Sequence, residues 1–378
     1  MSTKISVILR VNKRFIYIIL GGAIACTALP DQQFSLDASA VSMSDRVKAP
    51  SNQESLYDPL QIPFPKFSDY GFFEGSITDF QPAKGVHLYQ PANELFTDYA
   101  TKLRFIKIPG GEKITWNAKG EFEFPLHSVL VKHFLYPDTD RPLDGPIQML
   151  ESRILYLSES GWQAYTYVWN ETGTEAVLNQ VGDFKSVSYT HDGKRLNIEY
   201  VVPNKNECKN CHQRNNEMLP LGPTPDHLNF SWTPDGISQI EHWVGLGILD
   251  QPPSDWKDLS PSVVWNEPET GSIQQRALAY LEANCGHCHH PNGSAHTSGL
   301  FLQQDQKDPR RWGIGKPPVA AGKGSGNRKY SVEPGHPERS IILYRMTTNE
   351  PGEMMPELGR SVVHEEGIQL IRDWINSL

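Results

Sequence analysis

The stretch SVLVKHFLY, residues 128–136, has the two-residue period of an extended chain and is rich in β-branched and aromatic residues. Other segments between residues 58 and 200 share this character, and turns containing Gly, Pro or Asp separate them. They are EFEF (121–124), SRILYLSE (152–159), AYTYVWN (164–170) and RLNIEYVV (195–202). The sequence therefore predicts an antiparallel β domain, a sandwich or a curved sheet, over residues 58–262.

Composition and charge limit the classes of function. The chain has 378 residues, enough for two domains at roughly 150 residues each, and 38% of them are hydrophobic. Its formal net charge is −9. A nucleic-acid surface needs clustered Lys and Arg to neutralise phosphates, so no nucleic-acid partner is expected, and an acidic surface suits a basic protein partner.

The N-terminus has the pattern of an export signal. A basic opening precedes the short apolar run FIYIILGGAIACTAL (15–29), which predicts a signal peptide over residues 1–26, with a retained anchor helix as the alternative. AIAC, ending at Cys26, resembles the lipobox of bacterial lipoproteins, and this predicts lipidation of Cys26 rather than ordinary cleavage nearby. Residues 27–57 are then a flexible tether, and the protein is a periplasmic, membrane-anchored lipoprotein.

Four of the five cysteines lie in two copies of the pattern C-x-x-C-H. Two thiols on one helical turn can form thioether bonds to the two vinyl groups of a haem, and the following histidine can bind its iron. The competing readings are a zinc site, whose cysteine pairs lie close together in sequence, and a thioredoxin-like dithiol, which needs a βαβ setting. The two copies are predicted to attach two haems covalently: Cys208, Cys211 and His212; Cys285, Cys288 and His289.

The second motif has the setting that resembles class I cytochrome c. A predicted helix runs into it from residue 269, a long loop follows, and a second predicted helix closes the chain at residues 364–378. In that family a methionine directly before proline is the sixth ligand, which implies Met355, with Met354 as the substitute. Alternatively, both methionines fill space in the core. The resemblance implies an all-α cytochrome c domain over residues 263–378.

The first motif has a different setting, since a predicted strand leads into it. Its sixth ligand stays open: Met218, His227 and His242 are within reach along the chain, or the iron has an open position.

Two further family resemblances apply, one to most of the mature chain and one to the β-rich part alone. From about Asp69 onward, segments such as VVPNKNECKNCH (201–212) and NCGHCHHPNG (284–293) resemble an uncharacterised family of exported bacterial proteins that join a β-rich domain to a cytochrome c. More loosely, FPLHSVLVKHF (124–134) is similar to a strand of cytochrome P460, whose lysine can become cross-linked to haem; His127 replaces that family's glycine. This likeness implies a catalytic role for Lys132, against an ordinary snorkelling lysine.

Together these observations predict an α+β fold: an antiparallel, sandwich-like β domain followed by an all-α class I cytochrome c domain. The predicted function is electron transfer by a periplasmic di-haem c-type cytochrome with a redox partner protein. The alternative is a haem oxidoreductase in which an open first haem does substrate chemistry and the second relays electrons. A di-haem peroxidase is less favoured, because those enzymes resemble two cytochrome c domains in tandem.

Overall fold

The computed structural model describes residues 43–55, 57–117, 121–139, 145–215, 217–231, 236–250, 252–303, 305–319 and 321–378. Cys26, the signal and most of the tether lie outside these residues. Residues 41–378 form one unit, and the boundary expected after residue 262 stays a prediction. Within the described ranges, no helix has the length and apolar character needed to span a membrane.

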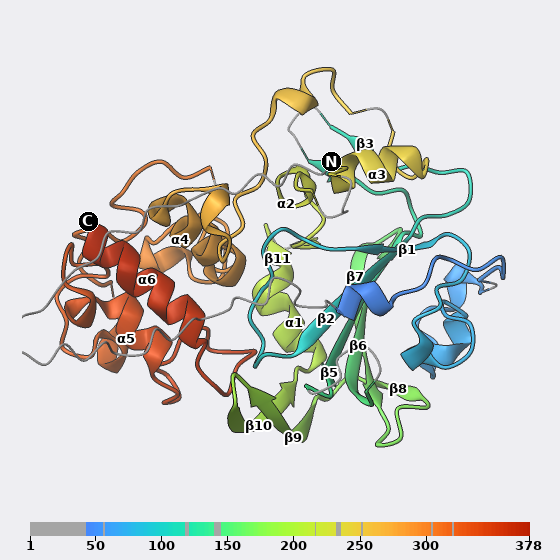
Figure 1. Ribbon diagram of the computed structural model, residues 1–378, viewed down its shortest axis with the longest axis horizontal. Helices are drawn as coiled ribbons and strands as arrows, with labels where there is room; N and C mark the ends of the chain where they lie inside the picture. The colour runs from blue at the N-terminus through green and yellow to red at the C-terminus, as the bar shows by residue number, and fades with distance from the viewer. Residues whose placement is uncertain are drawn as a thin grey trace, which may run out of the picture. The chain divides into compact units, whose positions relative to one another are not determined.

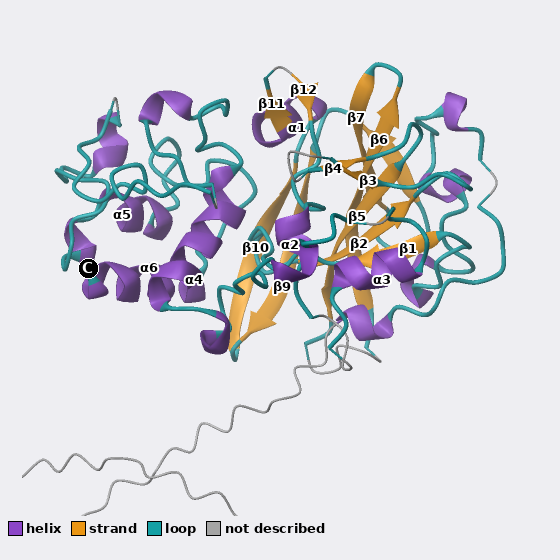
Figure 2. Cartoon of the chain, turned by 90° about the horizontal axis from the view of Figure 1, so that it is seen from above, coloured by secondary structure: helices purple, strands orange, loops and turns teal. Residues whose placement is uncertain are grey.

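The stretch SVLVKHFLY forms the central strand β5 (Val129–Pro137) of a six-stranded antiparallel sheet (Figures 1 and 2). The strand order is β1-β2-β5-β6-β7-β8, so each neighbour along the sheet is close in sequence. Both faces of β5 are largely buried, which explains why apolar residues on either side of Lys132 and His133 occupy successive positions rather than alternate ones. The other strands are β1 (Val86–Tyr89), β2 (Thr101–Lys107), β6 (Ile147–Ser158), β7 (Gly161–Trp169) and β8 (Ala176–Asn179).

One face of the sheet packs against the aromatic segment that precedes it. Phe67, Tyr70 and Phe72 are buried against Phe105 and Val131 of the central strands. This cover consists of turns and short 3-10 helices rather than a second sheet, so the layer is not a sandwich. The 3-10 helices are Met43–Arg46, Pro59–Gln61, Phe67–Tyr70 and Ile77–Asp79.

The other face carries two separate apolar clusters. At one end, Ile106 and Leu130 pack against Trp243 of helix α3 (Gln239–Gly245). At the other end, Phe134 packs near Tyr200 of the hairpin β9 (Asp183–His191) and β10 (Lys194–Val202). Polar and charged residues occupy the strip of sheet between the two clusters.

Short elements follow the hairpin. The first motif lies on its own helix, α1 (Lys205–His212), because Asn204 ends the extended chain and caps the helix. The remaining small elements are β3 (Thr115–Trp116), β4 (Phe122–Glu123), β11 (Gln213–Arg214), β12 (Glu217–Met218), α2 (Pro225–Leu228) and the 3-10 turns Trp256–Asp258 and Pro268–Thr270.

The predicted fold class is wrong, because the C-terminal part is not an all-α cytochrome domain. The described chain is β-rich, and about 25% of it is helical when the 3-10 and π turns are counted with the six α-helices. Of these six, only α4 (Ile273–Leu281), α5 (Ile341–Thr347) and α6 (Glu365–Ser377) lie in the predicted cytochrome c domain, residues 263–378. Gly- and Pro-rich loops and 3-10 turns fill the intervals, and parallel bridges such as Ile314 with Val332 pin them. The turns are His296–Ser298, Gly322–Ser325 and Pro337–Arg339.

The helices themselves follow their sequence pattern. Helix α6 buries Ile368, Ile371, Trp374 and Ile375, as its spacing predicts, and packs against α4 and α5. Leu378, four residues after Trp374 and in line with the same apolar stripe, is 39% exposed.

Asp98 joins the sheet to this C-terminal part. Its Oδ1 accepts hydrogen bonds from the backbone N–H groups of Ser361 (2.7 Å) and Val362 (2.9 Å), and its Oδ2 accepts from the Ser361 hydroxyl (3.1 Å). Asp98 is buried in a left-handed conformation, with φ of 49°. One carboxylate therefore satisfies two backbone donors of a loop far away in sequence.

We expect Asp98→Ala to lower the free energy of unfolding by about 2 kcal/mol, because two buried N–H groups lose their acceptor. Urea unfolding followed by tryptophan fluorescence measures the change. Asp255→Ala, at an exposed position, is the control and should stay within about 0.5 kcal/mol of the parent protein. Equal effects of the two substitutions would contradict the structural role of Asp98.

Candidate haem-binding site

The first motif is held by a capped helix of two turns. The Asn204 side chain accepts hydrogen bonds from the N–H groups of Asn206 and Glu207, and the Glu207 carboxylate accepts from the Asn204 N–H. This capping box fixes where α1 begins. Cys208 and His212, four residues apart, consequently lie on one side of the helix, with Cys211 one residue before the histidine.

His212 is fixed in one protonation state by its neighbours. Its Nδ1 lies 2.9 Å from the carbonyl oxygen of Leu219, which can only accept, so Nδ1 carries the proton. Burial first, and then the cations Lys132 and Arg153, lower the pKa of His212 to about 4, although the Leu219 carbonyl opposes them. At neutral pH the ring is uncharged and its Nε2 carries a lone pair, which is the form that binds a metal.

The second motif begins in a distorted helix end. Helix α4 widens into a single π-helical turn, Glu282–Gly286, which carries Cys285. Such turns are rare and are frequent at functional sites. His289 follows directly after Cys288, and its backbone N–H donates to the Cys285 carbonyl (2.9 Å).

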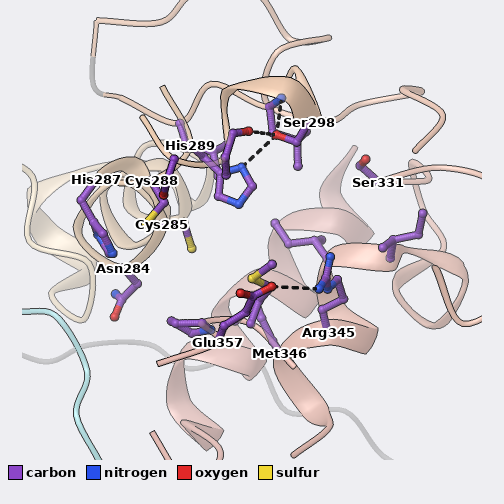
Figure 3. A pocket seen from close by; sticks show the side chains of 18 of the residues that line it. Asn284, Cys285, His287, Cys288, His289, Ser298, Ser331, Arg345, Met346 and Glu357 are labelled. Atoms are coloured by element: carbon purple, nitrogen blue, oxygen red, sulfur yellow. Dashed lines mark hydrogen bonds and ion pairs between the residues drawn. The ribbon is translucent and has the colours of Figure 1, made fainter. Parts of the chain in front are cut away.

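His289 has the same tautomer as His212, with a different partner. Its Nδ1 lies 3.1 Å from the Ser298 hydroxyl, and that hydroxyl donates its own proton to the Ala295 carbonyl (2.7 Å). Ser298 can therefore only accept from His289, so Nδ1 is protonated and Nε2 carries the lone pair (Figure 3). Burial lowers the pKa of His289 to about 4.

The second motif opens on a cavity of about 580 Å³, within the range of cofactor pockets. Cys285, Cys288, His289 and Met355 all line it. Met355 is partly exposed, whereas Met354 is buried and is not among the lining residues, so the two neighbouring methionines differ in what they face. The apolar part of the lining includes Leu300, Leu302, Ile341, Ile342, Met346 and Ile368.

Arg360 holds the loop that carries Met355. Its Nε donates to the Met355 carbonyl (3.2 Å), and its Nη2 donates to the carbonyls of Thr348 (2.7 Å) and Arg345 (3.1 Å). Its Nη1 donates to the Asn349 side chain (2.6 Å). A single buried guanidinium therefore closes both ends of the loop between α5 and Met355.

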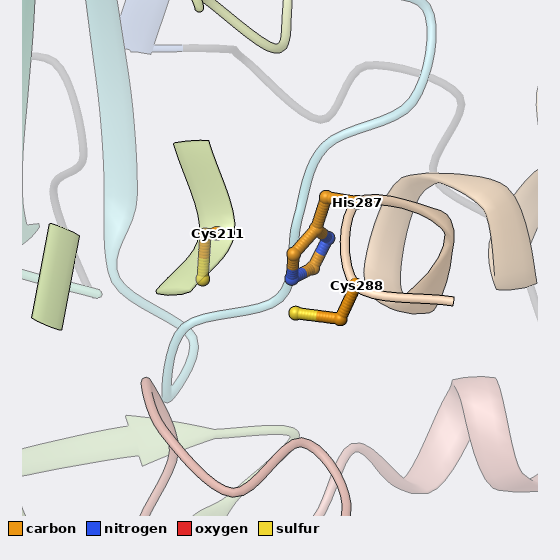
Figure 4. A group of neighbouring side chains, drawn as sticks. All are labelled: Cys211, His287 and Cys288. Atoms are coloured by element: carbon orange, nitrogen blue, oxygen red, sulfur yellow. The ribbon is translucent and has the colours of Figure 1, made fainter. Parts of the chain in front are cut away.

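The two motifs lie against each other, which the sequence did not predict. Cys211 lines the same cavity as the second motif, and its sulfur, the Cys288 sulfur and a His287 ring nitrogen all lie within 4.8 Å of one another (Figure 4). The thiol of Cys288 also points to the Asn210 carbonyl (3.4 Å). The argument against zinc from the separation of the cysteine pairs is therefore wrong, because folding brings the pairs together.

The contact between these two thiols changes how easily each loses its proton. A hydrogen bond between them lowers the pKa of Cys288 and raises that of Cys211. Burial first, and then the nearby Cys288, raises the pKa of Cys285 to about 12. The thiols of the second motif therefore differ in reactivity.

Lys132 lies on the strip of sheet between the two apolar clusters, near the first motif. Its Nζ is 4.7 Å from the centre of the Phe134 ring. Burial first, and then Arg104 and Arg153, hold the pKa of Lys132 well below its usual range. Since Lys132 and Arg153 also lower the pKa of His212, they lie within electrostatic range of that ring.

The other residues considered as ligands of the first site have different surroundings. His227 forms an ion pair with Glu282 (3.1 Å); burial alone would lower the pKa of His227, but this carboxylate raises it. Met218 packs in the apolar cluster around Trp243, and His242 lies half-buried on α3. Sequence reasoning missed Leu219, Ser298 and Arg360, whose roles depend on contacts that no local pattern announces.

We expect Arg360→Met to loosen the Met355 loop, because the carbonyls of residues 345, 348 and 355 lose their donor. Amide hydrogen exchange over residues 346–356 should become about tenfold faster or more, given about 1–3 kcal/mol for the lost hydrogen bonds. Arg372→Met, which removes a surface ion pair with Glu338, is the matched control and should leave this segment unchanged. Unchanged exchange in both variants would rule out the proposed role of Arg360.

Comparisons with protein families, curated proteins and solved structures find no match to this chain. The case for any function therefore rests on the side chains described above: two histidines with an available Nε2, four motif cysteines, and a cavity that Cys211, Cys285, Cys288, His289 and Met355 line.

Proposed function

We propose that this protein is a di-haem c-type cytochrome that transfers electrons. The observation that carries the proposal is the common state of the two motif histidines. A carbonyl holds His212 and a hydroxyl holds His289, and each ring is neutral with its Nε2 lone pair available. Unrelated local structures thus prepare the same metal-binding atom directly after each cysteine pair.

The residues around the second motif fit a haem. Cys285 and Cys288 would form the thioether bonds, and His289 and Met355 would hold the iron. The apolar lining would exclude water, and the half-buried Arg345 and the buried Arg360 would offer positive charge to the propionates. When bound, haem supplies an iron that changes reversibly by one electron.

At the first motif, Cys208, Cys211 and His212 would hold the other haem. Since the side chains of Cys211 and Cys288 lie next to each other in the fold, the two haems would be attached at points that are close in space. That proximity supports electron transfer within the molecule, from one site to the other. The residues needed for passing electrons are thus in one cluster.

Export, lipidation of Cys26 and a membrane-tethered location in the periplasm belong to the same proposal. Thioether-bound haem suits an exported protein, and an acidic chain of net charge −9 suits a basic redox partner.

Two observations favour other functions. The group formed by Cys211, His287 and Cys288 offers two thiols and an imidazole to a thiophilic metal such as zinc. The cations near His212 favour an oxidoreductase in which Lys132 acts at an open first haem. The experiments below separate these readings.

Mass spectrometry of the denatured protein, extracted to remove loose haem, should show two haem additions. The double variant Cys208→Ser/Cys211→Ser should lose one addition, and Cys285→Ser/Cys288→Ser should lose the other. Tightly bound zinc without any haem addition would instead favour the metal site at Cys211, His287 and Cys288.

Met355→Leu should remove the methionine absorption band of the second haem and lower its midpoint potential, because a thioether ligand raises the potential. Leucine keeps the volume, so the fold should change little. Met354→Leu is the matched control and should retain both band and potential. Loss of the band in Met346→Leu instead would show that the ligand comes from α5.

A further inference from the structure

A row of three cations crosses the sheet near the first motif. Arg104 on β2, Lys132 on β5 and Arg153 on β6 are direct neighbours in the antiparallel register. Like charges at directly opposed positions on neighbouring strands destabilise a sheet. The row lies between apolar clusters that contain Leu130 on one side and Phe134 on the other, where water screens charge poorly.

The acidic residues nearby balance only part of this charge. Glu94 pairs with Arg104 and lies 3.7 Å from the buried Lys102. Glu151, fully buried, pairs with Arg153 (2.5 Å). The Glu151 carboxylate also accepts a hydrogen bond from Tyr200 (2.6 Å). Two carboxylates therefore serve three of the four cations.

Lys132 is the cation that remains. Among the described residues, no carboxylate lies within ion-pair distance of its amine, and its contact is with the face of the Phe134 ring. Arg153 shares that ring, 4.4 Å from its centre. A cation–π contact offsets only part of the cost of removing an ammonium group from water. An arrangement of this kind is typical of a binding site for an anion.

The row is also close enough to the first motif to act on it. Helix α1, which carries the first motif, packs against strand β7, and Thr166 of β7 is the direct partner of Arg153 in the sheet. Lys132 and Arg153 consequently lie within electrostatic range of His212. An anion held by the row would therefore be within electrostatic range of whatever His212 binds.

We propose that Lys132, together with Arg104 and Arg153, binds a carboxylate or oxyanion beside His212. The inference rests on the proposed function, in which His212 holds an iron. Two sources share this chemistry: the propionate groups of the first haem, and a small free anion that reaches the iron. In either case Lys132 is a positioning residue for negative charge.

The test uses the full-length ferric protein and nitrite as the probe of a free oxyanion. Nitrite is titrated into the parent protein, Lys132→Met, Lys132→Arg and the control Lys194→Met, which alters an exposed lysine of β10. The haem spectrum reports binding, and redox titration gives the midpoint potential of the first haem. Circular dichroism checks folding, with Lys132→Gln as the replacement if Lys132→Met does not fold.

Nitrite that perturbs the spectrum, with binding weakened about tenfold or more in Lys132→Met but kept in Lys132→Arg, supports a free anion site. If nitrite has no effect but Lys132→Met lowers the midpoint potential of the first haem relative to Lys194→Met, the anion is a propionate. If Lys132→Met matches Lys194→Met in both measurements, the anion site is overturned.

The haem count by mass keeps the two proposals apart. If no haem is attached to Cys208 and Cys211, the proposed function fails for that motif. Calorimetric titration with nitrite then decides the anion site by itself: heat that Lys132→Met abolishes supports it, and absent or equal heat overturns it.

Discussion

The hydrogen bonds that Asp98 accepts from Ser361 and Val362 connect the two halves of this protein. Next to Ser361, Arg360 binds three carbonyl groups of the loop that carries Met355. Asp98 thus fixes the backbone of Arg360, and Arg360 fixes Met355. Because Asp98 lies just before strand β2, the position of a cavity-lining methionine depends on a carboxylate in the β-rich half.

The two motif histidines reach one chemical state by different routes. His212 faces a carbonyl in the chain just after the hairpin β11–β12, and His289 faces a hydroxyl in a 3-10 turn. In both cases Nδ1 donates a hydrogen bond to that oxygen, and the lone pair of Nε2 remains available. Burial keeps both rings neutral, so that a metal ion does not have to compete with a proton near neutral pH. The surroundings of His212 and His289 thus differ, but both leave a neutral ring with an available Nε2.

The charged strip of the sheet explains why the first site differs from the second. The second cavity has a largely apolar lining that includes His289 and Met355, an environment that would suit reversible electron transfer. The first motif lies near Lys132 and Arg153, and no residue of the described chain is assigned there as a second axial ligand. A site with positive charge and an open position could accept an anion. The two haems proposed here would therefore have unequal roles.

The sequence alone led to the haem hypothesis, with its C-x-x-C-H motifs and Met355, and to local elements such as the strand around Lys132 and the helices α4 and α6. These features depend on residues close together in the chain. The sequence also led to the wrong prediction of an all-α C-terminal domain, because two predicted helices say nothing of the loops between them, whose Gly and Pro residues prevent helix. Only the tertiary structure decided the partners of His212 and His289, the contact of Cys211 with Cys288 and the row of cations. Each depends on strand register or on contacts between segments distant in sequence, and burial in the folded chain turns these into a lowered pKa or an unbalanced charge.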